Sequence, residues 1–585
     1  MTGGWPCVHA PRAAAFATHH RDRFRSDVRY PTVLALLLLA TSPAAAQIAS
    51  SPVADPEAAA IVTQILGGAQ HPRLTHGALD DVTRDLWPLY DAEPDRLLWF
   101  DRGAPLPSVE GAVLAVNGVQ EFGLDPADYD AAALQVQWAL LKAGRATMVE
   151  RAQFDLALSI ASVRLVRAVH IGRVDPAHVR WKYDGPRKTL DPAALLQDAR
   201  AGRGLGDVLR GLEPTVSHYV RARATLATYR TLAAAGEPAP VPALPAGQKK
   251  VVPGQAWAGV PQLVARLRAV GDLVLDVHDT HTHYTGDIVE AVKRFQVRHG
   301  LEADGVIGAG TIRALNVPLA DRVRQSELAM ERMRWIPPSQ GQNIFVNVAN
   351  FRLWANDPRT RDEPLRMNVV VGQSLDHQTP LFVEQLEYIV FRPFWNPPRR
   401  ILLDEILPKA RRDPGYLARN QYEIVASGAD TAPALAPSPD NLDQVQQGRL
   451  TLRQRPGPNN SLGLAKFIFP NDEDVYMHGT PSRGGFAKAR RDLSHGCVRL
   501  EDPAALATWA LRDQPEWTRA RIDEAMNGDA PVRVTLRRPM TVVLFYDTVH
   551  VSRQGVVYFM EDIYAHDKVL DAALKQGSRY PMQSR

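Results

Sequence analysis

One segment, Val475–Leu500, constrains this chain more than any other part of its sequence. It contains Cys497 in the run Ser494-His495-Gly496-Cys497-Val498-Arg499-Leu500, and His478 lies nineteen residues before the cysteine. A thiol becomes a nucleophile when a base removes its proton, and imidazole is the usual base. Apolar residues flank both groups, which predicts short strands that deliver them to one place. The alternative is a buried structural cysteine beside unrelated histidines.

The N-terminus favours the catalytic reading of this cysteine. Residues 1–46 are predicted to be an export signal region, with arginines before the apolar run Val33–Ala40 and a small-residue cleavage site at Ala44–Ala46. An uncleaved N-terminal anchor is the alternative, although the apolar run is short for a membrane span. Cleavage removes Cys7 and leaves Cys497 as a lone thiol in a compartment that favours disulfides. A free thiol there is expected to have a task.

Length and composition predict several globular domains. The chain has 585 residues, of which 45% are hydrophobic and 23% are charged, as in ordinary globular proteins. The formal net charge is only +4, so charge gives no reason to expect binding to nucleic acid or to an anionic membrane surface.

Residues 80–232 are predicted to form a helical scaffold domain. Phe154, Leu158 and Leu165 recur at helical spacing in the long run Met148–Ile171. Aromatic residues are expected to seal the core of this domain: Trp87, Trp99, Phe100, Trp138 and Trp181. Residues 233–255 are rich in proline and alanine, which is typical of a linker.

Residues 256–318 are predicted to form a small three-helix module. Apolar periodicity places helices at Val260–Val270, Asp287–His299 and Thr311–Leu315. The segment Ala291–Asn316 resembles the peptidoglycan-binding domain found beside many cell-wall enzymes, which implies binding of glycan or peptide. Three histidines precede it in one tract: His278, His281 and His283. Their spacing does not fit a helical metal site, so we predict a solvated loop and no metal.

Residues 340–565 have sequence patterns typical of β-strands and are predicted to form a mostly-β domain. A last helix is expected just before this domain, at Leu328–Trp335. β-Branched and aromatic runs bounded by turn residues then recur from Ile344–Val348 to Val556–Phe559, and they include Val532–Leu536 and Val542–Tyr546. A charged segment with helical periodicity, at about 400–460, interrupts these strands. It is predicted to be a lid-like insertion. The predicted fold class is therefore multidomain α+β: a helical scaffold, a three-helix module, and a mostly-β domain with a helical insertion.

The opening segment can now be compared with a known signature. His478, a spacer of fifteen residues, and Ser494 to Arg499 resemble the signature of the L,D-transpeptidase catalytic domain, also called YkuD-like. Further runs with the same resemblance are Asn347–Trp354, Met367–Gly372, Gln378–Pro380 and Phe394–Pro398. With the scaffold and the peptidoglycan-binding module, the domain order is similar to that of the large periplasmic L,D-transpeptidases of Gram-negative bacteria.

The resemblance implies acyl transfer in the periplasm with no cofactor. Cys497 would attack the amide between a diamino acid and terminal D-Ala in a peptidoglycan stem peptide, and His478 would be the general acid and base. D-Ala would leave, and the side-chain amine of a second stem peptide would resolve the thioester into a 3→3 cross-link. Spacing alone leaves His495 open as the base, because residues two apart share a face of a strand; the resemblance favours His478 and leaves His495 a supporting role.

The remaining site residues follow from the same signature. Backbone N–H groups at Gly496 and Cys497 are expected to form an oxyanion hole. The predicted substrate-binding residues are Arg499, Tyr476, Gly479, Ser494, Trp395 and Asn396. Arg499 has a planar fork that suits a substrate carboxylate, and its alternative role is to brace the loop. Ser494 has a turn position as its alternative. Tyr476, Trp395 and Asn396 are expected as groove walls, with core or turn positions as their alternatives.

Several functions remain open at this stage. The same Cys–His pair serves an L,D-carboxypeptidase, with water as acceptor, and an enzyme that joins or releases a lipoprotein. A protein of another class, a wall-binding scaffold with an inactive catalytic domain, requires that Cys497 be unreactive. The local signature does not resemble that of papain-like proteases. The expected partners are stem peptides as donor and acceptor, with carbapenem β-lactams as inhibitors implied by the resemblance.

Overall fold

The computed structural model describes residues 55–577, except for 184, 186, 187, 275–281, 338–340 and 361. The predicted export region, and His278 and His281 of the histidine tract, lie outside the described residues, whereas His283 is exposed. Among the helices that are described, none is long and apolar enough to cross a membrane.

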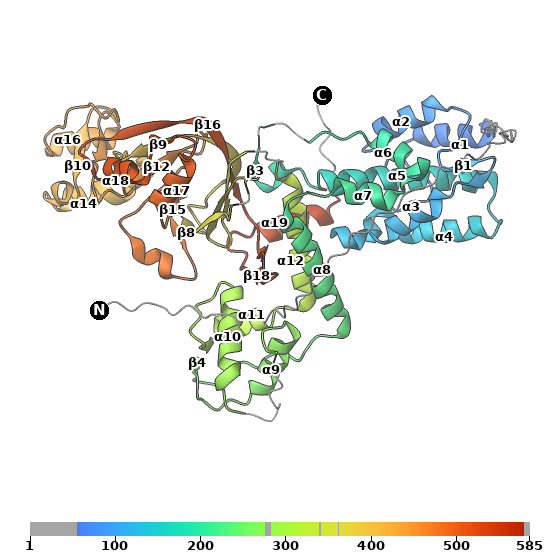
Figure 1. The fold of residues 1–585 in the computed structure, drawn as a ribbon, viewed down its shortest axis with the longest axis horizontal. Coiled ribbons are helices and arrows are strands. Elements are labelled where there is room, and N and C mark those ends of the chain that lie inside the picture. Colours follow the sequence, from blue (N-terminus) through green and yellow to red (C-terminus); the bar gives the residue numbers. More distant parts are fainter. Residues whose placement is uncertain are drawn as a thin grey trace, which may run out of the picture. The chain divides into compact units, whose positions relative to one another are not determined.

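The N-terminal helical region is built around α5, Met148–His170, which is buried on almost every side. Thr147 and Glu150 form a reciprocal capping box at its start, which satisfies amides that the first turn leaves free. The helices around it, coloured blue to green in Figure 1, are α1 (Pro56–Leu66), α2 (Thr83–Ala92), α3 (Ser108–Asn117), α4 (Ala131–Lys142), α6 (Pro192–Asp198) and α7 (Leu205–Leu212). Helix α8, Ser217–Ala235, follows them.

The predicted aromatic seal of this region is correct only in part. Trp99, Phe100, Trp138 and Phe154 lie in its core, and the rings of Trp138 and Phe154 stack at 6.0 Å. Trp87 is 42% exposed. Trp181 lies in β3, Trp181–Lys182, which pairs with the sheet of the C-terminal region, so this side chain belongs to a different core.

The middle module consists of α9 (Val260–Ala269), α10 (Gly286–Arg298) and α11 (Ala309–Leu315), with β4 (Lys250–Val251) paired to β5 (Ile307–Gly308). Its core includes Leu263, Val292 and Phe295. Val241 and Val251, from the segment 233–255, are buried in the same core. Part of the segment predicted as a linker therefore packs as part of this module.

The C-terminal region contains a mixed sheet whose strands come from distant parts of the sequence. In the order of pairing they are β12 (Ala465–Ile468), β13 (Met477–His478), β15 (Val498–Leu500), β8 (Leu365–Gly372), β7 (Arg352–Asn356), β6 (Asn343–Asn347), β16 (Val532–Phe545), β9 (Leu381–Phe391) and β3. Strand β12 also pairs with β9, so the path of pairings closes on itself, and β14 (Asp492–Ser494) pairs with β8. A closed path protects strand edges.

Two predicted elements of this region differ in extent from the structure. The two strands expected at Val532–Leu536 and Val542–Tyr546 are one strand, β16, whose pairing with β9 shifts register between Thr535 and Met540. The helix expected at Leu328–Trp335 begins earlier, as α12, Leu319–Trp335. The first turns of α12 are rich in polar residues, which is typical of a loop. Leu319, Arg322 and Ser326 are nevertheless buried there.

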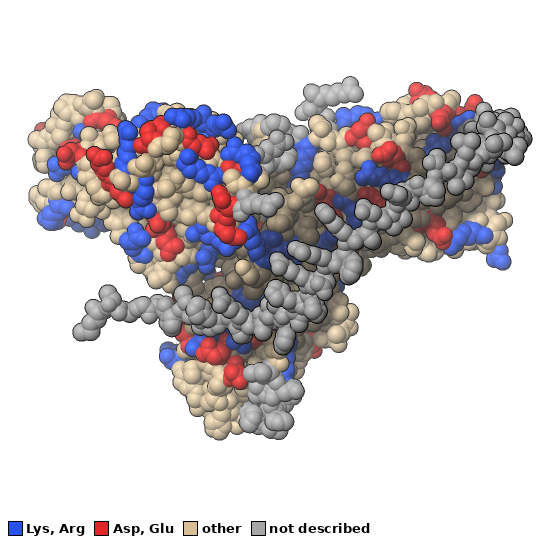
Figure 2. All heavy atoms as spheres, viewed as in Figure 1, with Lys and Arg blue, Asp and Glu red and all other residues tan. Residues whose placement is uncertain are grey.

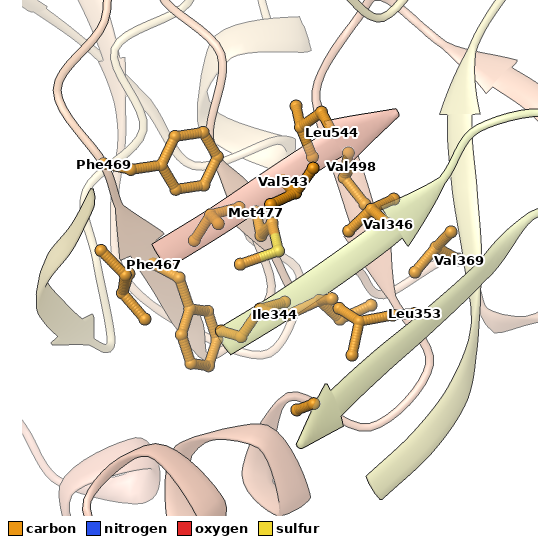
Figure 3. Packing of buried hydrophobic residues seen from close by; sticks show 14 of the residues in the cluster. Ile344, Val346, Leu353, Val369, Phe467, Phe469, Met477, Val498, Val543 and Leu544 are labelled. Atoms are coloured by element: carbon orange, nitrogen blue, oxygen red, sulfur yellow. The ribbon is translucent and has the colours of Figure 1, made fainter. Parts of the chain in front are cut away.

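One face of the sheet supplies the hydrophobic core (Figure 3). Phe467 of β12, Met477 of β13 and Val498 of β15 are fully buried and point into this core. Strands β6 and β16 contribute Ile344, Val346, Val543 and Leu544 to the same cluster. Because successive side chains of a strand point to opposite faces, the residues next to Phe467, Met477 and Val498 must face the other side.

The insertion has its own small core. It comprises α13 (Arg399–Ile401), α14 (Leu407–Arg412), α15 (Tyr416–Arg419), β10 (Tyr422–Val425), α16 (Pro439–Gln447) and β11 (Thr451–Gln454). Strands β10 and β11 pair antiparallel, and α16 lies between them in the sequence. The remaining C-terminal elements are α17 (Pro503–Ala510), α18 (Arg519–Asn527), β17 (Val549–Val551), β18 (Val557–Phe559) and α19 (His566–Lys575). Figure 2 shows acidic and basic side chains interspersed over the described surface.

Candidate active site

The histidine and the cysteine of the signature lie on neighbouring strands. His478 is in β13, and Cys497 directly precedes β15. The two strands are parallel neighbours, with Met477 opposite Val498 and His478 opposite Arg499. The amide of Val498 donates to the carbonyl of Tyr476 at 3.2 Å, which continues the pairing toward Cys497. Adjacent strands of a sheet lie about 4.8 Å apart. Cys497 lies two positions before Arg499, which is the residue opposite His478.

The alternation of side chains puts the polar members of these strands on one face. Met477 and Val498 point into the core, so Tyr476, His478, Cys497 and Arg499 face the opposite side. The face of the sheet opposite the core is therefore the candidate active site.

The thiol of Cys497 is half-buried and is not in a disulfide. It donates to the carbonyl of Asp474 at 3.9 Å, and among the described residues no hydrogen bond joins it to the imidazole of His478. Asp474 is held in a left-handed turn, with φ of 53°. Proton transfer to His478 therefore needs a rotation of the thiol, and contacts of this kind commonly tighten only when substrate is bound.

The imidazole of His478 is buried, with only 5% of its surface exposed. Its Nδ1 contacts the carbonyl of Gly479, and because a carbonyl only accepts, Nδ1 carries the proton and Nε2 is the basic nitrogen of the neutral ring. Burial, together with the positive charges of Arg499 and Lys466, lowers the pKa of His478 to about 3, although contacts with the Gly479 and Leu462 carbonyls act in the opposite direction. The ring is neutral at physiological pH, which is the form that accepts a proton.

The pKa of the Cys497 thiol is raised, chiefly by burial. The backbone of Tyr476 and the charges of Lys466 and Arg499 act in the opposite direction, and Asp474 adds to the rise. Burial also raises the pKa of the neighbouring Tyr476 hydroxyl, which interacts with the side chains of Trp395 and Cys497. The site is thus poorly solvated, and the ionised thiol depends on nearby cations.

His495 lies away from His478 and contacts the insertion instead. Its Nε2 is 2.6 Å from Oε1 of Glu405, and its ring is 4.5 Å from that of His377. Because Glu405 belongs to the insertion, this contact joins the insertion to the segment that carries the thiol. The geometry fits the supporting role predicted for His495, which stays a prediction.

The turn that presents Cys497 is fixed by three hydroxyl-containing side chains. Ser494 Oγ donates to the Cys497 carbonyl at 2.6 Å and accepts from the Gly496 amide at 3.2 Å. Thr379 Oγ1 donates to the Gly496 carbonyl at 2.7 Å and accepts from the Gly372 amide. The Tyr564 hydroxyl accepts from the Thr379 amide at 3.2 Å. Gly496 has φ of 117°, a conformation that favours glycine.

This bonding bears on the predicted oxyanion hole. The Gly496 amide is already bound to Ser494, so it is not free to bind a substrate oxygen unless that bond is shared. In the described part of the chain, the Cys497 amide has no such partner. The oxyanion role of Gly496 remains a prediction, and the amide of Cys497 is the better candidate of the two.

The other predicted substrate residues are distributed around this centre. Gly479 is closely packed: a Cβ added there would lie 3.2 Å from the Pro503 ring and 3.3 Å from the Leu462 carbonyl, which is a tight fit. The Trp395 ring lies 6.2 Å from that of Tyr422 in the insertion, and Asn396 is exposed and donates to the Gly428 carbonyl. Arg499 is half-buried beside His478. Gly479 is therefore part of the close packing beside His478. Trp395 and Asn396 lie at the border of the insertion.

Sequence reasoning missed four residues of the site: Lys466, Asp474, Glu405 and Thr379. Lys466 lies opposite His478 in β12, a pairing between segments whose register the sequence alone does not give. Thr379 was noted only as part of the run Gln378–Pro380. Within the described residues, no cluster of His, Cys, Asp and Glu has a geometry that holds a metal ion.

The mixed sheet presents a thiol and a neutral imidazole on one face of adjacent strands, which is an arrangement typical of cysteine-dependent sites. Comparison with known families identifies which one. Residues 341–534 match the family model of the YkuD L,D-transpeptidase catalytic domain. Residues 84–226 match a scaffold domain, and residues 258–315 match a family described as "Putative peptidoglycan binding domain". The chain therefore carries an L,D-transpeptidase catalytic domain of the YkuD family, and the predicted family and domain types are confirmed.

Three individual proteins align with parts of this chain. A "Putative L,D-transpeptidase" of Haemophilus influenzae is 31% identical over 249 residues, which are 42% of this chain and 49% of that protein, so the chain spans about half of its length. An L,D-transpeptidase structure from Xylanimonas cellulosilytica aligns at 15% identity over 52% of this chain and 100% of its own, with a TM-score of 0.16. One from Stackebrandtia nassauensis aligns at 14% identity over 52% of this chain and 98% of its own, with a TM-score of 0.21. These TM-scores carry no argument about the fold.

The Thr379 hydroxyl should be required for the stability of the catalytic turn. Thr379→Val removes the donor to Gly496 and the acceptor for Gly372 at a position that is only 1% exposed. We expect the free energy of unfolding to fall by about 1–3 kcal/mol, because buried polar groups lose their partners. Thr379→Ser keeps the hydroxyl and is the matched control, with a loss of less than about 1 kcal/mol in denaturant titrations. Equal losses in the two variants would contradict the role of the hydroxyl.

The buried imidazole of His478 should make the protein sensitive to acid. Its pKa is lowered to about 3 in the folded state, so below the ordinary value of 6.5 the unfolded chain binds a proton that the folded chain does not. Stability contributed by the neutral ring is therefore complete above about pH 6.5 and is lost as the pH falls toward 3. Between pH 7.5 and 4.5 we expect His478→Gln to lose up to about 2 kcal/mol less than the parent.

The exposed His283 supplies the control for this measurement. His283→Gln should lose the same stability on acidification as the parent in urea titrations at the two pH values. If His478→Gln also follows the parent, the imidazole is not held neutral by the fold.

Proposed function

We propose that this protein is a cysteine-dependent L,D-transpeptidase that forms 3→3 cross-links in peptidoglycan. The observation that carries the proposal is the register of β13 and β15, which puts His478 and Cys497 on the same face of adjacent strands within residues that match the YkuD catalytic domain. The peptidoglycan-binding family match supports peptidoglycan as substrate and a location outside the cytoplasm, at the cell wall. We further propose the periplasm, reached through the N-terminal export region.

The first half-reaction acylates the enzyme. Nε2 of His478 takes the thiol proton, and the Cys497 sulfur attacks the carbonyl of the amide that joins the diamino acid of the donor stem to terminal D-Ala. A tetrahedral oxyanion forms, for which the free amide of Cys497 is the candidate donor. The C–N bond then breaks, His478 returns the proton to the leaving amine, and D-Ala departs from a thioester.

The second half-reaction transfers the acyl group to an amine. The side-chain amine of a second stem peptide attacks the thioester carbonyl and loses a proton to His478. The C–S bond breaks, and the sulfur regains its proton as the new amide is released. Arg499 is the proposed contact for a substrate carboxylate, since its guanidinium is half-buried on the same face of the sheet.

The insertion is the proposed cap of the donor site. Glu405 of the insertion contacts His495, and Trp395 and Asn396 border it, so closing of this subdomain would exclude water near the thioester. Exclusion of water favours an amine acceptor over hydrolysis, which supports cross-linking. The scaffold and peptidoglycan-binding modules are proposed to hold the enzyme on its polymeric substrate.

The alternatives from the sequence remain as outcomes of experiment. With water as acceptor the enzyme would be an L,D-carboxypeptidase, and with a lipoprotein it would be an anchoring enzyme or the hydrolase that releases the lipoprotein. An inactive wall-binding scaffold would retain binding without any reaction at Cys497. We propose no cofactor for any of these reactions, and no role for nucleic acid.

The products made from purified disaccharide-tetrapeptide should identify the acceptor. We expect a dimer that has lost one D-Ala, detected by mass spectrometry, and no product from Cys497→Ala or His478→Ala. Tripeptide without dimer would replace the proposal with a carboxypeptidase. Neither product, from protein that still sediments with cell wall, would leave the binding scaffold.

A carbapenem should acylate Cys497 in the intact protein. Attack of the thiolate on the strained lactam carbonyl breaks the C–N bond of the ring and forms a thioester, so the protein mass should rise by the mass of one drug molecule. Cys497→Ala should show no mass change under the same conditions. An unchanged mass of the parent protein would count against an accessible nucleophile at this position.

A further inference from the structure

Lys466 is a charged residue of the active-site face that the proposed reaction does not use. It lies in β12 opposite His478, and its neighbour Phe467 lies opposite Met477 and points into the core. By alternation, Lys466 must face the side of the sheet that carries the thiol. Lys466, His478 and Arg499 therefore form one row across β12, β13 and β15.

The Lys466 ammonium is held close to the nucleophile by an aromatic ring. Its Nζ lies 3.9 Å from the centroid of the Tyr476 ring, which is a cation–π contact. The hydroxyl of the same tyrosine interacts with the Cys497 side chain. Tyr476 thus lies between the amine and the thiol and fixes both.

The charge of Lys466 is not cancelled by an ion pair. Within the described residues, no carboxylate lies within 4 Å of its Nζ, although Asp474 and Asp430 act on it from farther away. Burial lowers the pKa of this lysine, and the charge on Cys497 is the first influence that raises it. A half-buried cation without a close carboxylate has its strongest partner in an ionised thiol.

The same cations make a protonated His478 unfavourable. Lys466 and Arg499 both favour the thiolate of Cys497, Lys466 more strongly, while Asp474 opposes it. Arg499 and Lys466 also disfavour the imidazolium of His478. In a resting thiolate–imidazolium pair, these cations would therefore stabilise the thiolate and destabilise the imidazolium.

We propose that the Lys466 ammonium is the fixed counter-charge of the Cys497 thiolate and makes the thiol easier to ionise than burial alone would allow. The proton that the thiol loses still passes to Nε2 of His478, which returns it to the leaving amine of D-Ala. This inference rests on the proposed function for its biological meaning, but it concerns a property of the free enzyme.

The test is the pH dependence of alkylation of Cys497 by iodoacetamide, followed by peptide mass spectrometry in the full chain. The thiolate sulfur forms a bond to carbon as iodide leaves, so the rate reports the ionised fraction of the thiol. Lys466→Met should move the midpoint of the profile up by about one pH unit and slow alkylation about tenfold at pH 7. Lys466→Arg restores the charge and should return the midpoint to within about half a unit of the parent.

Three further variants make the outcome decisive. Lys466→Gln is a second neutral replacement, should Lys466→Met fail to fold, and Lys568→Met removes an exposed lysine elsewhere in the domain as a control. His478→Gln should shift the midpoint less than Lys466→Met does. A parental profile in both neutral Lys466 variants, or a larger shift in His478→Gln, would overturn the proposal. Because alkylation needs no peptide substrate, this result is independent of whether the protein makes cross-links.

Discussion

The catalytic region depends on one constraint, the register of three short strands. Strand β13 has only two residues, yet its pairing with β12 and β15 fixes Met477 between Phe467 and Val498 in the core. The burial of these three side chains is favourable by several kcal/mol in total, at about 25 cal/mol per Å² of apolar surface. The same pairing places Lys466, His478 and Arg499 on the face of the sheet opposite the core. The site is therefore positioned by hydrophobic packing on the opposite side of the sheet.

Poor solvation gives this site its chemical character. Burial keeps His478 neutral and would by itself keep Cys497 protonated, so the site starts with a good base and a weak nucleophile. Two cations on the same face act against the second tendency, and they also favour the neutral form of His478. Charges act strongly here because little water screens them. Ionisation of the thiol can therefore draw on fixed charges as well as on the base that carries its proton.

The sequence predicted those parts of the structure that local patterns determine. Helices such as α5 and α10 follow from apolar periodicity, and Cys497 and His478 follow from their motif. Lys466 and Glu405 were missed because they reach the site through pairing and packing between distant segments, which no local pattern encodes. Trp181 was assigned to the wrong core for the same reason: a two-residue strand joins it to β9, some two hundred positions later. The occupied amide of Gly496 depends on a rotamer of Ser494 that the motif does not specify.

The connection between His478 and Cys497 has a consequence for how such enzymes can diverge. Fifteen residues separate His478 from Ser494 and form a connection between strands. Pairing fixes both ends of this connection: β13 pairs with β15, and β14 pairs with β8. Insertions between Thr480 and Arg490, outside the paired residues, are expected to change the surroundings of the substrate but not the geometry of the nucleophile and base. A single residue added between Val475 and His478 has the opposite effect, since it turns the imidazole toward the core and the methionine toward solvent. The first segment is therefore expected to tolerate changes of length that the second does not.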